Sequence, residues 1–199
     1  MENGNVIGWH QGRDDKCLKI SQTADIMIQS TIQKGARFGF PLLGAYAAAL
    51  AGAVASMHAR EFYLGLKHPA WAPPGWVFGP VWGVLYTMMG LAAGLVACCP
   101  VDGRKGSSSG SQVKMAMAFY GIQLAANAIW SWLFFAWHLG LAAFGDIVLL
   151  WLLIAGTIRV FYTVRPLAAI LLLPYLAWVT FAAALCLAEW RLNTSVLGG

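Results

Sequence analysis

Tryptophan is the residue type in this chain that most invites a chemical interpretation, and there are ten of them. Each indole offers a rigid, flat, apolar surface with one N–H donor, which suits a large planar apolar guest. Trp82, Trp130 and Trp178 lie in three different apolar segments. We expect these three rings to meet around one cavity. The alternative is that they pack helices together or form aromatic belts at a membrane surface.

Polar and aromatic side chains follow a helical spacing in one of these segments, at positions 123, 127, 130, 131 and 134. At about 3.6 residues per turn, these positions share one face of a helix. Lipid does not solvate amide, indole or hydroxyl groups, so this face must point toward other helices or a cavity. We expect Asn127 to orient a guest. Hydrogen bonding between helices, with Gln123 taking part, is the structural alternative.

Asp146 is an acid inside another apolar segment. A carboxylate within a membrane span is costly and by default suggests a functional site. Asp146 also follows a short loop at His138, so its side chain can reach interfacial water or bond to Asn127. We favour a structural or guest-orienting role over a proton relay.

Familiar catalytic and metal-binding patterns are missing from the sequence. There is no Cys/His cluster with metal spacing, no Gly-x-Ser-x-Gly motif and no phosphate-binding loop. The histidines lie in predicted loops or at span ends, and the cysteines form no Cys-x-x-Cys pair; they are His10, His58, His68, His138, Cys17, Cys98, Cys99 and Cys186. We therefore predict no metal site. Cys98 and Cys99 are either lipidated or simply apolar.

The composition indicates a membrane protein. Hydrophobic residues make up 59% and charged residues 11%, against about 45–50% and about 25% in a soluble domain. The formal charge of +5 could suggest nucleic acid, but the basic residues mostly flank apolar segments. Charge that biases membrane orientation is the simpler interpretation, and it would place the N-terminus in the cytosol.

The apolar segments predict an all-α integral membrane protein with five transmembrane helices. The predicted spans cover about residues 38–58, 76–98, 113–137, 141–162 and 167–191. Residues 1–36 form a polar extension that we expect to be mobile, residues 37–193 the membrane domain, and residues 194–199 a tail. Pro174 is expected to interrupt the fifth span. A short connection at residues 138–140 makes the third and fourth spans antiparallel.

The connection between the first and second spans carries a long ordered motif. Residues 67–86 read KHPAWAPPGWVFGPVWGVLY. Consecutive prolines fix φ and remove N–H donors, so residues 71–74 must be extended and a helix can begin only after them. We predict a stiff aromatic lid built from Trp71, Pro73, Pro74 and Trp76.

This motif resembles the signature of the tryptophan-rich sensory protein or translocator protein family, which is a Lys-Pro-type dipeptide, Trp-x-Pro-Pro-x-Trp, Pro-x-Trp and Leu-Tyr. The resemblance covers about residues 38–193 and includes residues 123–127, Trp130, Asp146 and residues 174–178. It implies a five-helix membrane bundle, often dimeric. Such bundles bind porphyrins, haem, sterols and benzodiazepine-type ligands beneath the first loop.

The resemblance also suggests site residues. Some bacterial members degrade protoporphyrin in light through two tryptophans, and by position these look like Trp82 and Trp178, which would be catalytic only if this chain degrades porphyrin. No cofactor is required, and haem or protoporphyrin is the expected ligand. The residues expected to contact the guest are Trp71, Pro73, Pro74, Trp76, Trp82, Tyr86, Asn127, Trp130, Asp146, Trp178 and Ala182.

The sequence departs from the family at three places. Residues 185–191 lack the central tyrosine of the sterol-recognition pattern, which puts cholesterol binding in doubt. Ala142 stands where some members place a pocket tryptophan, and Cys186 replaces a usual asparagine. These changes affect tetrapyrrole binding less than sterol binding.

The resulting hypothesis is a receptor or transporter-like protein that binds tetrapyrroles, and as a second class sterols, in stress response or tetrapyrrole homeostasis. A light- or oxygen-dependent porphyrin-degrading enzyme is one alternative, and a ligand-free membrane adaptor is another. The polar extension favours a eukaryotic, plant-like member, located in the mitochondrial outer membrane or the ER/Golgi. In mitochondria the resemblance implies a cytosolic lid and C-terminus. The expected partners are the bilayer and a second copy of the chain, with no nucleic acid.

Overall fold

The computed structural model describes residues 6–100 and 109–198, and within these residues it is helical with no strand. The chain divides into two units, Met1–Arg37 and Phe38–Gly199. Helix α1 occupies Val6–Ala55. The all-α part of the predicted fold class is therefore confirmed.

The apolar part of α1 that is long enough to cross a membrane is Asp25–Ala55. It begins earlier than the predicted residue 38, because Ile26, Met27, Ile28 and Ile32 extend the apolar sequence toward the N-terminus. The predicted mobility of residues 1–36 stays a prediction.

The second unit continues with helices that follow the predicted order. They are α2 (Ala59–Gly65), the 3₁₀ helix η1 (Gly75–Val77), α3 (Phe78–Ala97), α4 (Gly110–Ser131), the π-helix η2 (Trp132–Ala136), α5 (Gly140–Val164), α6 (Pro166–Leu171) and α7 (Leu173–Leu192). Pro166 fits the first turn of α6 because proline lacks an N–H that would go unused there. The break between α6 and α7 immediately precedes Pro174, as the sequence predicted.

Four helical segments in the described residues are long and apolar enough to cross a membrane: Asp25–Ala55, Gly75–Ala97, Gly140–Val164 and Pro166–Leu192. They correspond to the first, second, fourth and fifth predicted spans. The third predicted span contains α4, which carries more polar residues, among them Gln112, Lys114, Gln123 and Asn127. The fifth crossing therefore stays a prediction.

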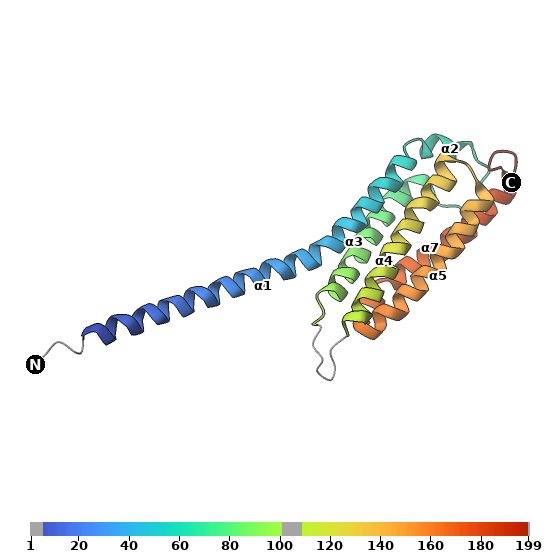
Figure 1. Cartoon of the computed structure of the whole chain (residues 1–199). Helices are drawn as coiled ribbons and strands as arrows, with labels where there is room; N and C mark the ends of the chain where they lie inside the picture. The colour runs from blue at the N-terminus through green and yellow to red at the C-terminus, as the bar shows by residue number, and fades with distance from the viewer. Residues whose placement is uncertain (1–5, 101–108, 199) are drawn as a thin grey trace, which may run out of the picture. The chain divides into compact units, whose positions relative to one another are not determined.

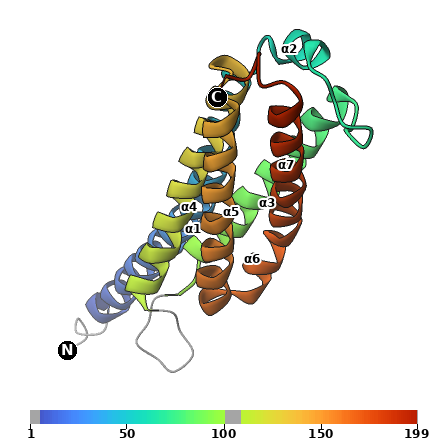
Figure 2. The same cartoon turned by 90° about the vertical axis from the view of Figure 1, so that its right-hand side faces the viewer.

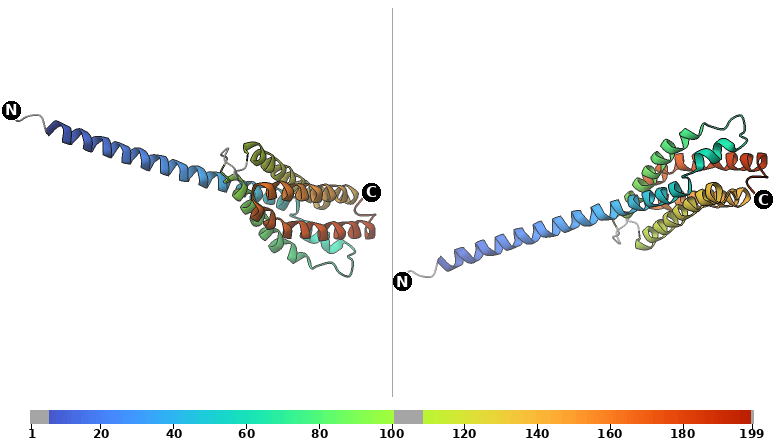
Figure 3. Two further views of the ribbon diagram at one scale, coloured as in Figure 1. Left: turned by 90° about the horizontal axis from the view of Figure 1, so that it is seen from below. Right: turned by 90° about the horizontal axis from the view of Figure 1, so that it is seen from above.

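The helices of the second unit pack side by side. Helix α5 lies between α4 and α7, and α3 packs against α4 and α6 (Figure 1, Figure 2). The neighbouring positions of α4 and α5 are also visible in both views of Figure 3. Helix α2 and the C-terminus lie at the same end of this bundle (Figure 2).

Close backbone approach depends on glycine at two points of α3. A Cβ at Gly90 would lie 2.8 Å from the Cα of Leu42, and a Cβ at Gly94 would lie 3.0 Å from the carbonyl oxygen of Phe38. Side chains therefore cannot be added there without separating α3 from residues 38–42.

Few polar residues are buried in the interior of the bundle. Within the described residues they are Gln123, Asn127, Thr157, Glu189 and Asn193. Buried polar groups are costly unless they are hydrogen-bonded, so their partners indicate what the interior holds in place.

Candidate functional site

Aromatic side chains of α3 and α7 face each other in two successive pairs, which we term the aromatic ladder. The ring centroids of Phe78 and Trp178 lie 5.9 Å apart, and those of Trp82 and Tyr175 lie 6.2 Å apart. Both pairs are edge-to-face, a favourable arrangement for aromatic rings. Phe78 and Trp82 are one turn apart on α3, and Tyr175 and Trp178 are one turn apart on α7. Trp82 and Trp178 therefore face the interior of the bundle.

A hydrogen-bonded group lies directly beside this ladder. The Tyr86 hydroxyl donates to Oδ1 of Asn127, and Nδ2 of Asn127 donates to the Tyr175 hydroxyl over 3.0 Å. The Trp82 and Tyr86 rings are 5.5 Å apart. Asn127 thus connects α3 and α7 from a position on α4. The structure therefore brings four of the predicted residues together around Tyr175. They are Trp82, Tyr86, Asn127 and, one turn along α7, Trp178.

Other buried polar atoms have no partner. Within the described residues, the buried side-chain atoms without a hydrogen bond are Gln123 Oε1, Trp130 Nε1, Asp146 Oδ2, Trp178 Nε1 and Trp190 Nε1. Three of these five belong to residues that the sequence predicted to contact a guest, namely Trp130, Asp146 and Trp178. Unpaired buried groups are rare and costly, so their concentration in predicted site residues is informative.

Trp130 lies apart from the ladder. Its ring stacks on Phe134 at 5.4 Å and meets Phe135 edge-on at 5.8 Å. It contacts both the main core and a smaller cluster that contains Leu66, Phe134 and Cys186. No ring pair joins Trp130 to Trp82 or Trp178 among the described residues. The expected convergence of three tryptophans is therefore visible as ring contact only around α3 and α7.

The lid motif has a defined structure. Residues 66–74, which we term the strap, connect α2 to η1 without helix. Trp71 contacts Phe181 of α7 at 5.8 Å, and Phe181 contacts Trp178 at 5.5 Å. The carbonyl oxygen of Pro73 accepts a hydrogen bond of 3.1 Å from the Tyr63 hydroxyl.

The remaining predicted residues of the lid and of α7 are placed less directly. Pro74 precedes η1 and is extended, with φ −62° and ψ 141°. Trp76 within η1 is 75% exposed, so it does not face the ladder. Ala182 is buried in the core, one turn beyond Trp178.

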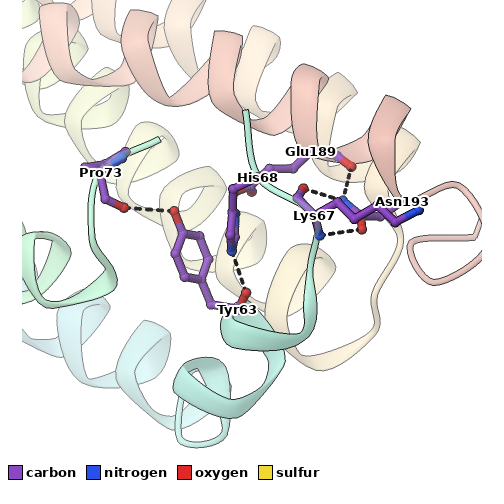
Figure 4. Close-up of polar contacts among 6 residues, drawn as sticks. All are labelled: Tyr63, Lys67, His68, Pro73, Glu189 and Asn193. Carbon is purple, nitrogen blue, oxygen red and sulfur yellow. Dashed lines mark hydrogen bonds and ion pairs between the residues drawn. The ribbon is translucent and has the colours of Figure 1, made fainter. Parts of the chain in front are cut away.

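One end of the strap is fixed to α7 by a second polar group, which we term the latch: Lys67, His68, Glu189 and Asn193 (Figure 4). Asn193 Oδ1 accepts from the Lys67 N–H over 2.8 Å, while Asn193 Nδ2 donates to the Lys67 carbonyl over 2.9 Å. Nδ1 of His68 lies 2.9 Å from Oε1 of Glu189. Nε2 of His68 lies 2.7 Å from the Tyr63 carbonyl oxygen. Both nitrogens of His68 are therefore occupied.

Sequence reasoning missed the latch. Glu189 lies near the end of the fifth predicted span, and its side chain is only 3% exposed. The signal was present, because an acid near the end of an apolar helix is expensive to bury and needs a partner. The partner could not be found from sequence, since His68 lies 121 positions away.

A separate surface hollow of about 360 Å³ is lined by Met57, His58, Arg60, Glu61 and Leu64. It lies where α1 meets α2 and includes none of the predicted guest-contacting residues. The facing rings of the aromatic ladder contact each other, so a guest that stacks between them must displace these rings or part α3 from α7.

Comparison with known proteins adds a family assignment. The sequence model of the TspO/MBR family matches residues 39–191. The chain is 34% identical over 148 residues to the protein CrtK of Rhodobacter capsulatus, covering 74% of this chain and 88% of that protein. It is 37% identical over 139 residues to the translocator protein of Sus scrofa, covering 70% and 79% respectively. It is 37% identical over 133 residues to the tryptophan-rich sensory protein of Cereibacter sphaeroides, covering 67% and 77%.

Proposed function

The chain belongs to the TspO/MBR family, and on that premise we propose that it binds a flat tetrapyrrole, such as haem or protoporphyrin, between α3 and α7. It is an integral membrane protein with several apolar helices. The proposed role is that of a receptor, scavenger or transporter for this guest. Relatives named sensory protein and translocator protein agree with such a role.

The observation that carries the proposal is the set of unpaired polar atoms next to aromatic surface. The indole N–H of Trp178 is buried without a partner while its ring belongs to the aromatic ladder. Trp130 and Asp146 each contribute one further unpaired atom. A tetrapyrrole has a flat apolar body, ring nitrogens and carboxylate side chains. It can therefore stack on the indoles and accept hydrogen bonds from their N–H groups.

The hydrogen-bonded group around Asn127 has a supporting role in this proposal. The hydroxyls of Tyr86 and Tyr175 are both hydrogen-bonded to Asn127. These bonds hold α3, α4 and α7 at a fixed spacing beside the ladder. The Trp82 ring packs against the rings of Tyr86 and Tyr175, so this group also positions Trp82. Preorganised aromatic walls reduce the entropy that a guest must lose on binding.

The test is a titration of the purified full-length protein with protoporphyrin, haem and cholesterol, followed by quenching of tryptophan fluorescence. Replacing Trp82→Phe and Trp178→Phe together is expected to weaken protoporphyrin binding by about tenfold, roughly 1.4 kcal/mol, because indole surface and one free N–H are lost. Trp76→Phe is the matched control, since this tryptophan is exposed. Unchanged affinity in the double variant would end the proposal.

A second candidate function is porphyrin breakdown in light with oxygen as oxidant. The observation in its favour is that Trp82 lies 5.5 Å from Tyr86, so two oxidisable rings adjoin the proposed guest. Illumination of the protein with protoporphyrin separates the two functions. A binder gives ordinary photobleaching, whereas an enzyme gives a new open-chain tetrapyrrole product that is lost in the Trp82→Phe variant.

A fifth membrane crossing belongs to the same proposal. Helix α4 and η2 form a continuous helical segment, Gly110–Ser131 followed by Trp132–Ala136. At about 1.5 Å per residue this segment is long enough to cross a hydrocarbon layer of about 30 Å. Its polar residues Gln123 and Asn127 are buried in the bundle, so they would not face lipid. Sterol binding, a homodimer and the organelle also stay predictions.

A further inference from the structure

The latch joins two parts of the chain that are far apart in sequence. Lys67 and Asn193 are 126 positions apart, and both backbone polar groups of Lys67 are held by the one Asn193 side chain. Asn193 is itself fixed by a bond of 2.8 Å from Nδ2 to the Glu189 carbonyl. The strap is therefore fastened to the last turn of α7 by a paired amide and by the His68–Glu189 contact.

The hydrogen bonds of His68 determine how many protons the latch holds. Nε2 faces the Tyr63 carbonyl, which only accepts, so Nε2 must carry a hydrogen. Nδ1 faces a Glu189 carboxyl oxygen at 2.9 Å. A proton must lie between these two atoms, either on the imidazole or on the carboxyl group. Without it, the Nδ1 lone pair would face a carboxylate.

We propose that His68 and Glu189 form a one-proton latch that holds the strap closed over α7, and that loss of this proton as pH rises releases the strap and opens access to Trp178. The effect on access rests on the proposed function. The latch itself does not.

Among the described residues, four further titratable side chains lie close to the pair in space or in sequence. Tyr63 stacks near His68 with ring centroids 4.1 Å apart, and burial, followed by the charge of Glu189, raises the pKa of Tyr63 to about 12. The Tyr63 hydroxyl already donates to Pro73. Cys186, one turn before Glu189, is buried. Lys67 and Arg191, the nearest basic side chains in sequence, are exposed to solvent.

The sign of the pH effect follows from counting protons. Solvated histidine and glutamate side chains have ordinary pKa values of about 6.5 and about 4.3, so at about pH 8 an open pair binds no proton. The closed pair binds one. Closure is therefore most favoured between about pH 4.3 and about pH 6.5, where the open pair also binds one proton. It weakens as pH rises above this range, by up to about tenfold per pH unit for a difference of one proton.

The strap is placed to control the aromatic ladder. Its Trp71 contacts Phe181, which contacts Trp178, while Tyr63 contacts Phe78 at 5.7 Å. Helix α2 thus contacts the Phe78–Trp178 pair directly at Phe78, while the strap reaches Trp178 through Phe181. Release of Lys67 and His68 from α7 frees the end of the strap that precedes Trp71.

The experiment measures amide hydrogen exchange of residues 66–74 in the full-length protein, in nanodiscs, between about pH 6 and about pH 8.5. The wild type is compared with Glu189→Gln at each pH, so the intrinsic pH dependence of exchange cancels. A glutamine amide can donate to neutral Nδ1, so this variant closes without the extra proton. We expect equal exchange at low pH and about tenfold faster exchange in the wild type at the high end.

Two further variants serve as a second test of the latch and as a control. His68→Gln removes the imidazole and is expected to abolish the excess pH dependence even if Glu189→Gln does not fold. His58→Gln is the matched control, because His58 is exposed in the surface hollow. It is expected to keep the wild-type profile.

The rate of tryptophan quenching by protoporphyrin gives the second readout. It is expected to rise with pH in the wild type and to stay level in Glu189→Gln. Identical exchange profiles in these two proteins would overturn the latch, even if protoporphyrin binds tightly. If exchange in the strap depends on pH but the quenching rate does not, the proposal that the strap controls access to Trp178 would be overturned. A pH-dependent strap without any porphyrin binding would support the latch and contradict the proposed function.

Discussion

The C-terminal end of α7 and its middle differ in whether their buried polar groups have hydrogen-bond partners. At the end, Glu189 and Asn193 are paired with the strap through three contacts of 2.8–2.9 Å, and a fourth of 2.8 Å joins Asn193 to the Glu189 carbonyl. In the middle, Trp178 is half-buried, and its indole N–H is buried without a partner. Trp190 is the exception at the end, since its N–H also lacks a partner.

This difference separates two uses of buried polarity. Paired groups stabilise a particular backbone arrangement, because breaking one leaves the other unsatisfied. Unpaired groups cost stability in the free protein and regain it only when something else supplies a partner. We therefore expect substitutions at the end of α7 to lower stability, and substitutions in the middle to lower guest affinity.

The largest effect is expected from Asn193→Ala. The variant loses three hydrogen bonds, so the free energy of unfolding should fall by about 2–4 kcal/mol at about 0.5–1.5 kcal/mol per bond. Thermal unfolding in detergent is the measurement, and Thr194→Ala, at an exposed neighbour, is the control. A melting temperature equal to that of the control would contradict the view that hydrogen bonds to the strap stabilise this end of α7.

Gly140→Ala tests the packing at the same end. A Cβ there would lie 2.6 Å from Cδ1 of Trp190 and 3.0 Å from Cβ of Leu197. The expected loss is about 1–3 kcal/mol, the usual cost of overpacking. Gly145→Ala on the same helix has nothing within 4 Å of its new Cβ and should be neutral or slightly stabilising. Equal melting temperatures of the two variants would show that the C-terminal tail does not pack there.

Trp178→Phe is expected to behave in the opposite way. It removes an N–H that has no partner, so stability should change by less than about 1 kcal/mol. Affinity for protoporphyrin should fall about fivefold, which corresponds to one hydrogen bond of about 1 kcal/mol. Thermal unfolding and fluorescence titration are measured on the same samples. A large loss of stability with unchanged affinity would reverse the assignment of the two regions.

The smallest effect is expected from Asp146→Asn. One carboxylate oxygen of Asp146 is buried without a partner. Replacing the charge with an isosteric amide should leave stability unchanged or raise it by less than about 1 kcal/mol, because an uncompensated charge in a membrane helix is unfavourable. Unfolding in detergent checks this. A clear loss of stability would mean that Asp146 has a partner that the carboxylate requires.

Parts of the fold follow from local sequence alone. The positions of four apolar segments, the short turn before α5 and the break before Pro174 depend on runs of residues that are neighbours in the chain. The inward direction of Asn127 also follows, since helical spacing and the cost of exposing an amide to lipid leave it one direction. The 50-residue length of α1 did not follow, because the polar composition of residues 1–36 suggested a mobile extension.

What the sequence by itself determined is the family signature, the membrane character and the helical faces, because these depend on spacing along a single helix or loop. Only the tertiary structure decided which faces meet. It paired Phe78 with Trp178, placed Tyr175 between Trp82 and Asn127, and brought His68 to Glu189. Contacts between distant segments depend on how whole helices pack against one another, and no local pattern of residues records that choice.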